Sequence, residues 1–264
     1  MNFDVTLINY NHGTKISRMI SSICNNTILP TKLIIVDDGS NDNSKQEIEK
    51  FASKHSFIKP YFFSKNRGSF AAGKFARSKV TSSYFACTSS DDYVESDYFE
   101  NALQYAKIYP QAGIIFGNMS IVNEVNEITY IAKASKLKSG SFTAPQVFMD
   151  DYLMHEKVTH CQSSANLYRS EAFFYFGDYH NELYGIRDNI HTKTIGLKFG
   201  VVYLNKIFYN WYQGNKTTSG KYNNDFTKRK KASTKAYELM TNDYKDLYTK
   251  NFANKWRNEY LYSF

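Results

Sequence analysis

The chain has 264 residues, of which 42% are hydrophobic and 22% are charged, and its formal net charge is +8. It has no apolar run near the roughly 18 residues that span a bilayer and no secretion-signal pattern at its start, so we expect a cytoplasmic protein. Its three cysteines lack CxxC spacing and are typical of free thiols in a reducing compartment. The positive charge predicts an anionic partner, such as a nucleotide, a nucleic acid or an anionic membrane.

Residues 1–90 alternate apolar strands with amphipathic helices. The predicted strands cover residues 4–8, 33–36, 57–64 and 84–89. The predicted helices between them cover residues 14–26, 44–55 and 70–80. This alternation predicts right-handed crossovers and an α/β fold with a parallel sheet.

The remainder of the chain is less regular. The predicted helices there cover residues 96–109, 145–155, 170–177 and 188–196. The predicted strands cover residues 113–122, 127–132, 163–168, 201–204 and 207–212. A basic run at residues 228–231 then opens a helical region that leads to an aromatic C-terminal end.

Polar side chains follow each of the four predicted strands of the first part. They are Asn9, Tyr10, Asp37, Asp38, Asn66, Arg67, Asp91 and Asp92. Parallel strands present their carboxyl ends at one edge of the sheet, and ligands of open α/β sheets bind at that edge. Four polar clusters converging on one edge therefore predict a ligand site.

Asp91 and Asp92 follow the apolar strand at residues 84–89, with only Ser90 between. Adjacent carboxylates repel, so one takes up a proton unless a cation or hydrogen-bond donors hold both of them ionised. A hard divalent metal ion with a phosphate-bearing ligand is one solution. The alternative is a solvated turn that leads into the next helix.

In combination, these segments resemble glycosyltransferase family 2, whose members have the GT-A fold. The resemblance rests on VTLINYN at residues 5–11, LIIVDDGSNDNS at 33–44, NRGSFAAGKFA at 66–76, YFACTSSDD at 84–92 and the later Asp188. It implies a Rossmann-like, mostly parallel central sheet with helices on both faces. It also implies an inverting transfer of a sugar from a nucleotide donor, usually UDP-linked, with Mn²⁺ or Mg²⁺.

The resemblance also implies roles for individual residues. Donor nucleotide binding falls to Asn9, Tyr10, Asp37, Asp38, Arg67, Lys74 and Asp91. Among these, Tyr10 would line the base pocket, Asp38 would bind the base edge and Asp37 would support that loop. Arg67 and Lys74 would contact the base or diphosphate, and Asp91 would face the ribose or donor sugar.

Asp92 is the implied metal ligand, and Asp188 is the implied catalytic base. A carboxylate within hydrogen-bond reach can take the proton of the acceptor hydroxyl as that hydroxyl attacks. The alternative for Asp188 is a helix N-cap, a position that aspartate favours in any case.

Several positions depart from the family pattern. Ser89 stands where the first aspartate of the Leu-Asp-x-Asp-Asp motif is usual, and Arg187 replaces the glutamate of a Glu-Asp pair. Gly73 and Lys74 replace an Arg-Asn pair in the third helix. Residues 212–215 lack a histidine that completes the metal site in some members.

We therefore predict a domain over residues 1–215, with a nucleotide-binding half at 1–94 and an acceptor-binding half at 95–215. The expected acceptor is a glycan or lipid-linked glycan of bacterial surface polysaccharide. The alternatives are a non-catalytic sugar-nucleotide or glycan-binding protein and a nucleotidyltransferase, although residues 9–14 supply no Gly-rich phosphate loop with a lysine. No motif indicates nucleic-acid binding.

The expected C-terminal extension covers residues 216–264. Its basic run and aromatic end could bind an anionic inner-membrane surface, where each basic residue contributes about 1 kcal/mol. The alternative is that its helices pack their aromatic side chains on the domain, or on a second subunit in a homodimer.

Overall fold

The computed structural model describes residues 1–123, 127–155, 163–212 and 225–262. The strands are β1 (Phe3–Asn9), β2 (Lys32–Asp37), β3 (Ile58–Phe62), β4 (Tyr84–Ser89), β5 (Tyr93–Val94), β6 (Ile114–Val122), β7 (Ile128–Ala132), β8 (Phe142–Thr143), β9 (Asn166–Arg169) and β10 (Val201–Tyr212). The helices are α1 (Gly13–Cys24), α2 (Ser44–Ala52), α3 (Ser69–Arg77), α4 (Tyr98–Ile108), α5 (Pro145–Val147), α6 (Ser170–Phe174), α7 (Arg187–Phe199), α9 (Phe226–Glu238) and α10 (Lys250–Tyr262).

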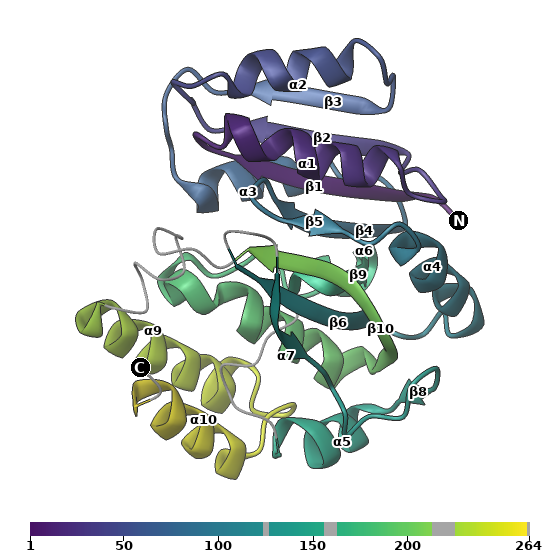
Figure 1. Ribbon diagram of the computed structural model, residues 1–264. Coiled ribbons are helices and arrows are strands. Elements are labelled where there is room, and N and C mark those ends of the chain that lie inside the picture. Colours follow the sequence, from purple (N-terminus) through teal and green to yellow (C-terminus); the bar gives the residue numbers. More distant parts are fainter. Residues whose placement is uncertain (124–126, 156–162, 213–224, 263–264) are drawn as a thin grey trace.

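The strands form one ten-stranded sheet with the order β3-β2-β1-β4-β9-β6-β10-β5, to which β7 and β8 add at β6 and β10 (Figure 1). The strands β3, β2, β1 and β4 run parallel, as do β6 and β10. β9 lies antiparallel between β4 and β6. The prediction of a mostly parallel α/β sheet is confirmed, and β9 joins its two parallel parts.

Helices cover both faces of this sheet. One core contains residues of α1, α2 and α4, packed against alternate residues of β1 and β2. On the opposite face, α3 packs against Ile34 and Val36 of β2, and α6, α7, α9 and α10 share a second large core. The spacing of α1 explains its orientation, because Ile16, Met19, Ile20 and Ile23 are all fully buried on one side of the helix.

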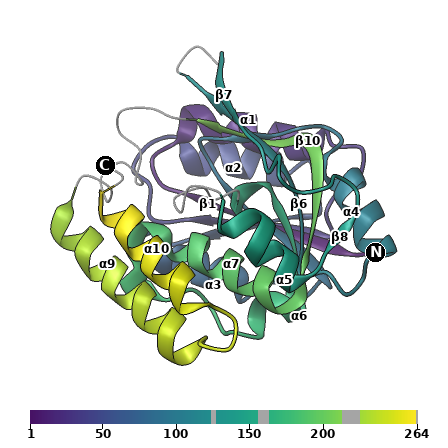
Figure 2. The ribbon, with the colours of Figure 1, turned by 90° about the horizontal axis from the view of Figure 1, so that it is seen from below.

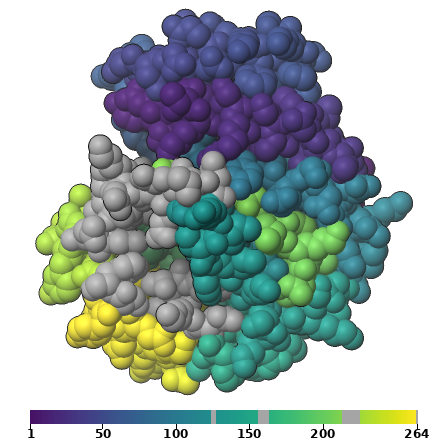
Figure 3. All heavy atoms as spheres, viewed as in Figure 1, coloured from purple at the N-terminus to yellow at the C-terminus, as the bar shows by residue number. Residues whose placement is uncertain are grey.

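The C-terminal helices belong to that second core. Trp256 and Phe252 of α10 are fully buried, and Tyr260 is 3% exposed. Figures 1 and 2 both show α9 and α10 side by side and close to α7, and in the space-filling view they lie at the end of the molecule opposite to β2 and α2 (Figure 3). Most of the aromatic surface of α10 is therefore used for packing on the rest of the chain.

Several predicted elements differ from the structure. Residues 201–212 form a single strand, β10, whose pairing with β6 shifts register between Tyr203 and Tyr209. The exposed Asn205 and Lys206 lie in this irregular stretch. Because these two polar residues interrupt the apolar pattern, the sequence predicts two strands instead of one. The predicted strand at 163–168 begins only at Asn166, after a single turn at Ser163–Ala165. In place of the predicted helix at 145–155, the structure has the short helix α5 followed by a π-helical segment at Phe148–Leu153.

Among the described residues, none of the helices has the length and apolar composition that crossing a membrane requires.

Candidate functional site

The polar ends of three parallel strands meet at one edge of the sheet. Asn9 at the end of β1 pairs with Asp37 at the end of β2, and Ile8 pairs with Ser89 at the end of β4. The edge predicted from the sequence therefore forms, and the loops that follow these strands lie next to one another.

Asp37 holds the loop after β2 in place. Its Oδ1 accepts a hydrogen bond from the Ser40 amide at 3.0 Å, and its Oδ2 accepts from Ser40 Oγ at 2.6 Å and from Asn9 Nδ2 at 2.7 Å. Only 3% of Asp37 is exposed. In this conformation the side chains of Asp37 and Asn9 make hydrogen bonds within the loop and do not point into open space at the edge.

Asp38 holds the start of α3 in the same way. Its Oδ1 accepts from the Arg67 amide at 2.7 Å, and its Oδ2 accepts from the Gly68 amide at 2.9 Å. Gly68 has a φ of 88°, a backbone conformation that side chains with a Cβ rarely adopt. Asp38 is 3% exposed, and these two hydrogen bonds tie the β2 loop to the start of α3. The predicted contact with a base edge stays a prediction.

Three other predicted nucleotide-binding residues lie on the surface of the molecule. Tyr10 is 42% exposed, beside Asn11 with its positive φ of 54°. The Arg67 guanidinium lies 4.2 Å from the centre of the Phe63 ring. Lys74 is exposed on α3. Tyr10 and Arg67 lie in the loops that follow β1 and β3, whereas Lys74 lies within α3 and is not among the residues that line the cavity described below. The roles of all three remain predictions.

Asp91 and Asp92 have different surroundings. Asp92 is 2% exposed, and its two oxygens accept hydrogen bonds from the Tyr209 hydroxyl and the Tyr212 amide, both at 2.8 Å. Burial, together with the nearby charge of Asp91, raises the pKa of Asp92 well above its usual value, although both hydrogen bonds oppose this shift. Asp92 thus joins β4 to β10.

Asp91 is the more open of the two carboxylates. It is half-buried, and within the described ranges its side chain makes no hydrogen bond or ion pair, whereas its backbone oxygen accepts from Arg18 Nη2 at 2.6 Å. Beside it, His12 and Ser90 share a hydrogen bond of 2.9 Å. The geometry therefore favours Asp91 over the predicted Asp92 as a ligand for a group outside the protein.

The residues at this edge fit a metal ion that the substrate helps to hold. The described part of the chain contains no cluster of three His, Cys, Asp or Glu side chains suited to a metal ion. Mg²⁺, however, is commonly held by one or two carboxylates together with substrate phosphates. The open Asp91 carboxylate matches that arrangement. Of the departures at residues 212–215, positions 213–215 lie outside the described residues.

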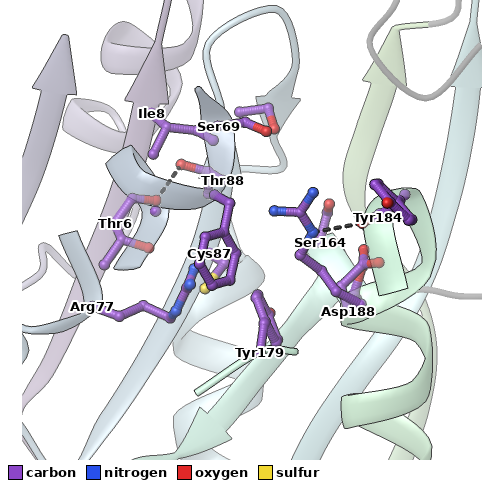
Figure 4. Close-up of a pocket in the computed structure, with 16 residues that line it drawn as sticks. Thr6, Ile8, Ser69, Arg77, Cys87, Thr88, Ser164, Tyr179, Tyr184 and Asp188 are labelled. Atoms are coloured by element: carbon purple, nitrogen blue, oxygen red, sulfur yellow. Dashed lines mark hydrogen bonds between the residues drawn. The ribbon is translucent and has the colours of Figure 1, made fainter. Parts of the chain in front are cut away.

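A cavity of about 240 Å³ opens behind the ends of β1 and β4 (Figure 4). It lies on the sheet face that α3 covers, and the start of α7 forms its opposite wall. Its lining residues are Thr6, Ile8, Ser69, Phe70, Gly73, Arg77, Cys87, Thr88, Ser89, Ser163, Ser164, Tyr179, Tyr184, Gly185, Arg187 and Asp188. The mixture of hydroxyl groups, two guanidinium groups and one carboxylate suits a polar ligand of sugar size.

Asp188 is the carboxylate of this cavity. It is the second residue of α7, which begins at Arg187 after Ile186, so it is not the N-cap of the helix. Its Oδ2 accepts from Ser163 Oγ at 2.5 Å, and its Oδ1 accepts from the Asn189 amide at 2.9 Å. These contacts fix the carboxylate at the wall of the cavity, where a ligand hydroxyl can reach its remaining lone pairs.

Sequence reasoning missed several residues of the cavity, among them Arg77, Tyr179 and Ser163. The position of one of them, Arg77, could have been predicted from the sequence. Arg77 follows Gly73 by four residues on a predicted helix, a spacing that places both on the same face. Tyr179 and Ser163 come from irregular segments, for which no periodic pattern predicts a position.

Comparisons with known proteins agree with this fold. The sequence profile described as glycosyl transferase family 2 matches residues 4–176. The chain therefore belongs to glycosyltransferase family 2. The match covers the strand-end residues and ends before Asp188, and the roles of all these residues remain predictions.

Curated relatives match parts of the chain. A cholesterol galactosyltransferase of Borreliella burgdorferi is 36% identical over 98 residues, which is 37% of this chain and 27% of that protein. The glycosyltransferase GlyA of Streptococcus pneumoniae is 27% identical over 208 residues, which is 76% of this chain and 29% of that protein. The chain thus spans less than a third of the length of either relative.

Solved structures show the same fold over the whole chain. S. aureus TarS 1-349 in complex with UDP-GlcNAc superposes with a TM-score of 0.73 at 15% identity, covering 100% of this chain and 73% of that one. The mannosyltransferase PcManGT of Pyrobaculum calidifontis, in complex with GDP-Man and Mn²⁺, gives a TM-score of 0.62 at 14% identity, covering 99% and 69%. The predicted GT-A fold is confirmed.

Proposed function

We propose that this chain is an inverting glycosyltransferase that moves a sugar from a nucleotide-sugar donor, with UDP as the expected nucleotide, to a hydroxyl of an acceptor. The observation that carries the proposal is the position of the Asp188 carboxylate in the cavity wall, opposite the ends of β1 and β4 (Figure 4). A donor anchored at the strand ends would place its sugar in this cavity, next to a carboxylate.

Asp188 would act as the general base. An acceptor hydroxyl that enters beside α7 gives its proton to the carboxylate while its oxygen attacks the anomeric carbon. The bond to the nucleoside diphosphate breaks on the opposite side of that carbon, so the configuration inverts. The hydrogen bond from Ser163 Oγ to Asp188 Oδ2 fixes the direction of the carboxylate during this step.

Asp91 would hold the divalent cation, Mn²⁺ or Mg²⁺, together with the donor diphosphate. Such a cation stabilises the negative charge that develops on the departing nucleoside diphosphate. Support comes from the open carboxylate of Asp91, and from the two relatives of known structure that hold UDP-GlcNAc in one case and GDP-Man with Mn²⁺ in the other.

The proposed acceptor is a glycan or lipid-linked glycan of bacterial surface polysaccharide. Exposed Lys230 and Lys231 on α9 would bring the protein to an anionic inner-membrane surface from the cytoplasmic side. Because α10 buries most of its aromatic residues, this contact would be electrostatic and would weaken as salt is raised.

Donor turnover tests the proposed function. UDP-glucose, UDP-galactose, UDP-N-acetylglucosamine and GDP-mannose are each incubated with the protein and Mn²⁺, and nucleotide release is measured. We expect at least one donor to be turned over, including by slow hydrolysis, and Asp188→Asn to reduce that rate. Asp151→Asn, an exposed carboxylate outside the cavity, is the matched control. Donor binding without any turnover would instead identify a sugar-nucleotide binding protein.

A further inference from the structure

Arg77 is a buried cation on the floor of the cavity. It lies at the end of α3 and is 6% exposed, and its Nε donates to Asp178 Oδ1 at 2.7 Å. Its guanidinium lies 4.3 Å from the centre of the Tyr179 ring. Its Nη2 has no hydrogen-bond partner within the described ranges. A buried donor without an acceptor is unfavourable, so the guanidinium has hydrogen-bonding capacity that the described residues do not use.

Gly73 leaves the space that the Arg77 guanidinium occupies. A Cβ at position 73 would lie 2.9 Å from Arg77 Nη1, closer than two such atoms approach each other. Glycine in the interior of a helix is unfavourable for stability. The sequence of α3 thus places a helix-destabilising glycine where it leaves room for the Arg77 guanidinium, and both residues line the cavity.

The charges around the cavity are balanced. On the side of α3, the positive charge of Arg77 is paired with Asp178. On the opposite side, Arg187 and Asp188 are adjacent at the start of α7. Burial raises the pKa of Cys87 and of Tyr179, which keeps both groups uncharged at neutral pH. A ligand group that carries its own charge would find no net opposite charge among these residues.

We propose that the guanidinium of Arg77, which lines the cavity, donates a hydrogen bond to an uncharged oxygen, a hydroxyl or an acetamido carbonyl, of the sugar being transferred. The transferred sugar is therefore a neutral hexose or N-acetylhexosamine rather than a uronic acid. This inference rests on the proposed function, and it deepens it by naming a residue that recognises the sugar. Figure 4 shows Arg77 on one side of the cavity and Asp188 on the other, which leaves room for a sugar between them.

The test compares binding of nucleotide sugars with binding of the free nucleotides. Dissociation constants of the wild type, Arg77→Gln and Asp178→Asn are measured by calorimetry with Mn²⁺. The probes are UDP-glucose, UDP-galactose, UDP-N-acetylglucosamine, GDP-mannose, UDP-glucuronic acid, UDP and GDP. We expect Arg77→Gln to weaken binding of the neutral donor about tenfold or more and binding of its nucleotide less than threefold. Only the donor carries the sugar, so only the donor loses the hydrogen bond from the charged guanidinium. We expect UDP-glucuronic acid to bind the wild type more weakly than that neutral donor.

Asp178→Asn is the structural control, because it breaks the same ion pair but keeps the guanidinium. A purely structural role for Arg77 would make the two variants alike, weakening donor and nucleotide in the same proportion, and would overturn the inference. So would an unchanged donor affinity in Arg77→Gln, which would mean that another group or the acceptor occupies the cavity. Tighter binding of UDP-glucuronic acid than of any neutral donor would overturn the choice of a neutral sugar.

Gly73→Ala keeps the inference testable if Arg77→Gln does not fold. Alanine favours the helix, and its Cβ pushes on Nη1, so we expect a folded protein with the same selective loss of donor affinity. If the wild type binds no nucleotide and no nucleotide sugar, the proposed function fails and this inference fails with it. If the wild type binds a donor but neither variant loses donor affinity selectively, only the role of Arg77 is wrong.

Discussion

The hydroxyl of Tyr209 on β10 donates a hydrogen bond of 2.8 Å to Asp92 Oδ2, at the point where β4 ends. The same hydroxyl oxygen accepts from the Ser89 amide at 3.1 Å. Tyr209 is fully buried and Asp92 is 2% exposed. This contact joins the loop after β4 to β10, in the irregular second part of the sheet, next in sequence to the half-buried Asp91.

Tyr209→Phe should destabilise the protein. It leaves one oxygen of a buried carboxylate and one backbone amide without their partner, and each such loss costs about 1–3 kcal/mol. The loss of the hydrogen bond also raises the pKa of Asp92 further, because that bond favours the charged form. Urea unfolding at neutral pH would show a lower midpoint for the variant. Tyr130→Phe, which alters an exposed tyrosine on β7, should leave the midpoint unchanged.

Asp91 and Asp92 can be separated by their response to metal. If Asp91 holds the cation, Asp91→Asn should abolish the increase in donor affinity that Mn²⁺ produces while leaving the free energy of unfolding nearly unchanged. Asp92→Asn should mainly alter stability, since both oxygens of Asp92 are already bonded within the protein. Calorimetric titrations of UDP with and without Mn²⁺ measure the first effect. Loss of the Mn²⁺ response in Asp92→Asn alone would restore the metal role that the sequence predicts for Asp92.

Asp188→Asn should separate binding from transfer. The amide keeps the shape of the carboxylate but cannot take a proton, so the transfer rate should fall by about 10²- to 10⁴-fold with donor affinity nearly unchanged. Ser163→Ala removes the hydrogen bond to Asp188 Oδ2 and should cause a smaller loss, because the base itself remains. Single-turnover transfer at saturating donor measures both. Wild-type rates in Asp188→Asn would show that another group is the base.

Much of the first part of the fold follows from the sequence. Short apolar strands that alternate with amphipathic helices predict a parallel sheet, and the polar residues at their ends, such as Asn9 and Asp37, predict that these residues share one edge. The helical spacing of Ile16, Met19, Ile20 and Ile23 predicts the buried side of α1 correctly. These patterns depend only on residues that are close in sequence, so they can be interpreted without knowing how the rest of the chain packs.

The partners of the site residues could not be predicted in this way. That Asp38 bonds to the Arg67 and Gly68 amides, or that Asp92 bonds to Tyr209, depends on how distant segments pack. Arg77 shows the same limit, because its burial depends on Asp178 and Tyr179 in an irregular segment about 100 residues later. Sequence patterns identify which side chains reach the edge but not which of them are left open for a ligand.

The buried His191 should make stability fall in mild acid. It is 4% exposed, its Nε2 lies 3.0 Å from the backbone oxygen of Phe173, and its ring packs against those of Phe173 and Tyr179. Burial lowers the pKa of His191 from 6.5 to about 4. Because the folded form binds the proton less readily than the unfolded chain, stability is fully present above pH 6.5 and is lost as the pH falls toward 4.

A shift of that size corresponds to about 3 kcal/mol at its full extent, since one pKa unit is about 1.4 kcal/mol. His191→Gln keeps a side chain that can donate to the Phe173 oxygen but cannot titrate. The wild type should therefore lose stability relative to His191→Gln between pH 6.5 and 4, and urea unfolding across that range measures the difference. Parallel curves for the two proteins would mean that His191 titrates alike in the folded and unfolded chains, and that the ring is not sealed from water between Phe173 and Tyr179.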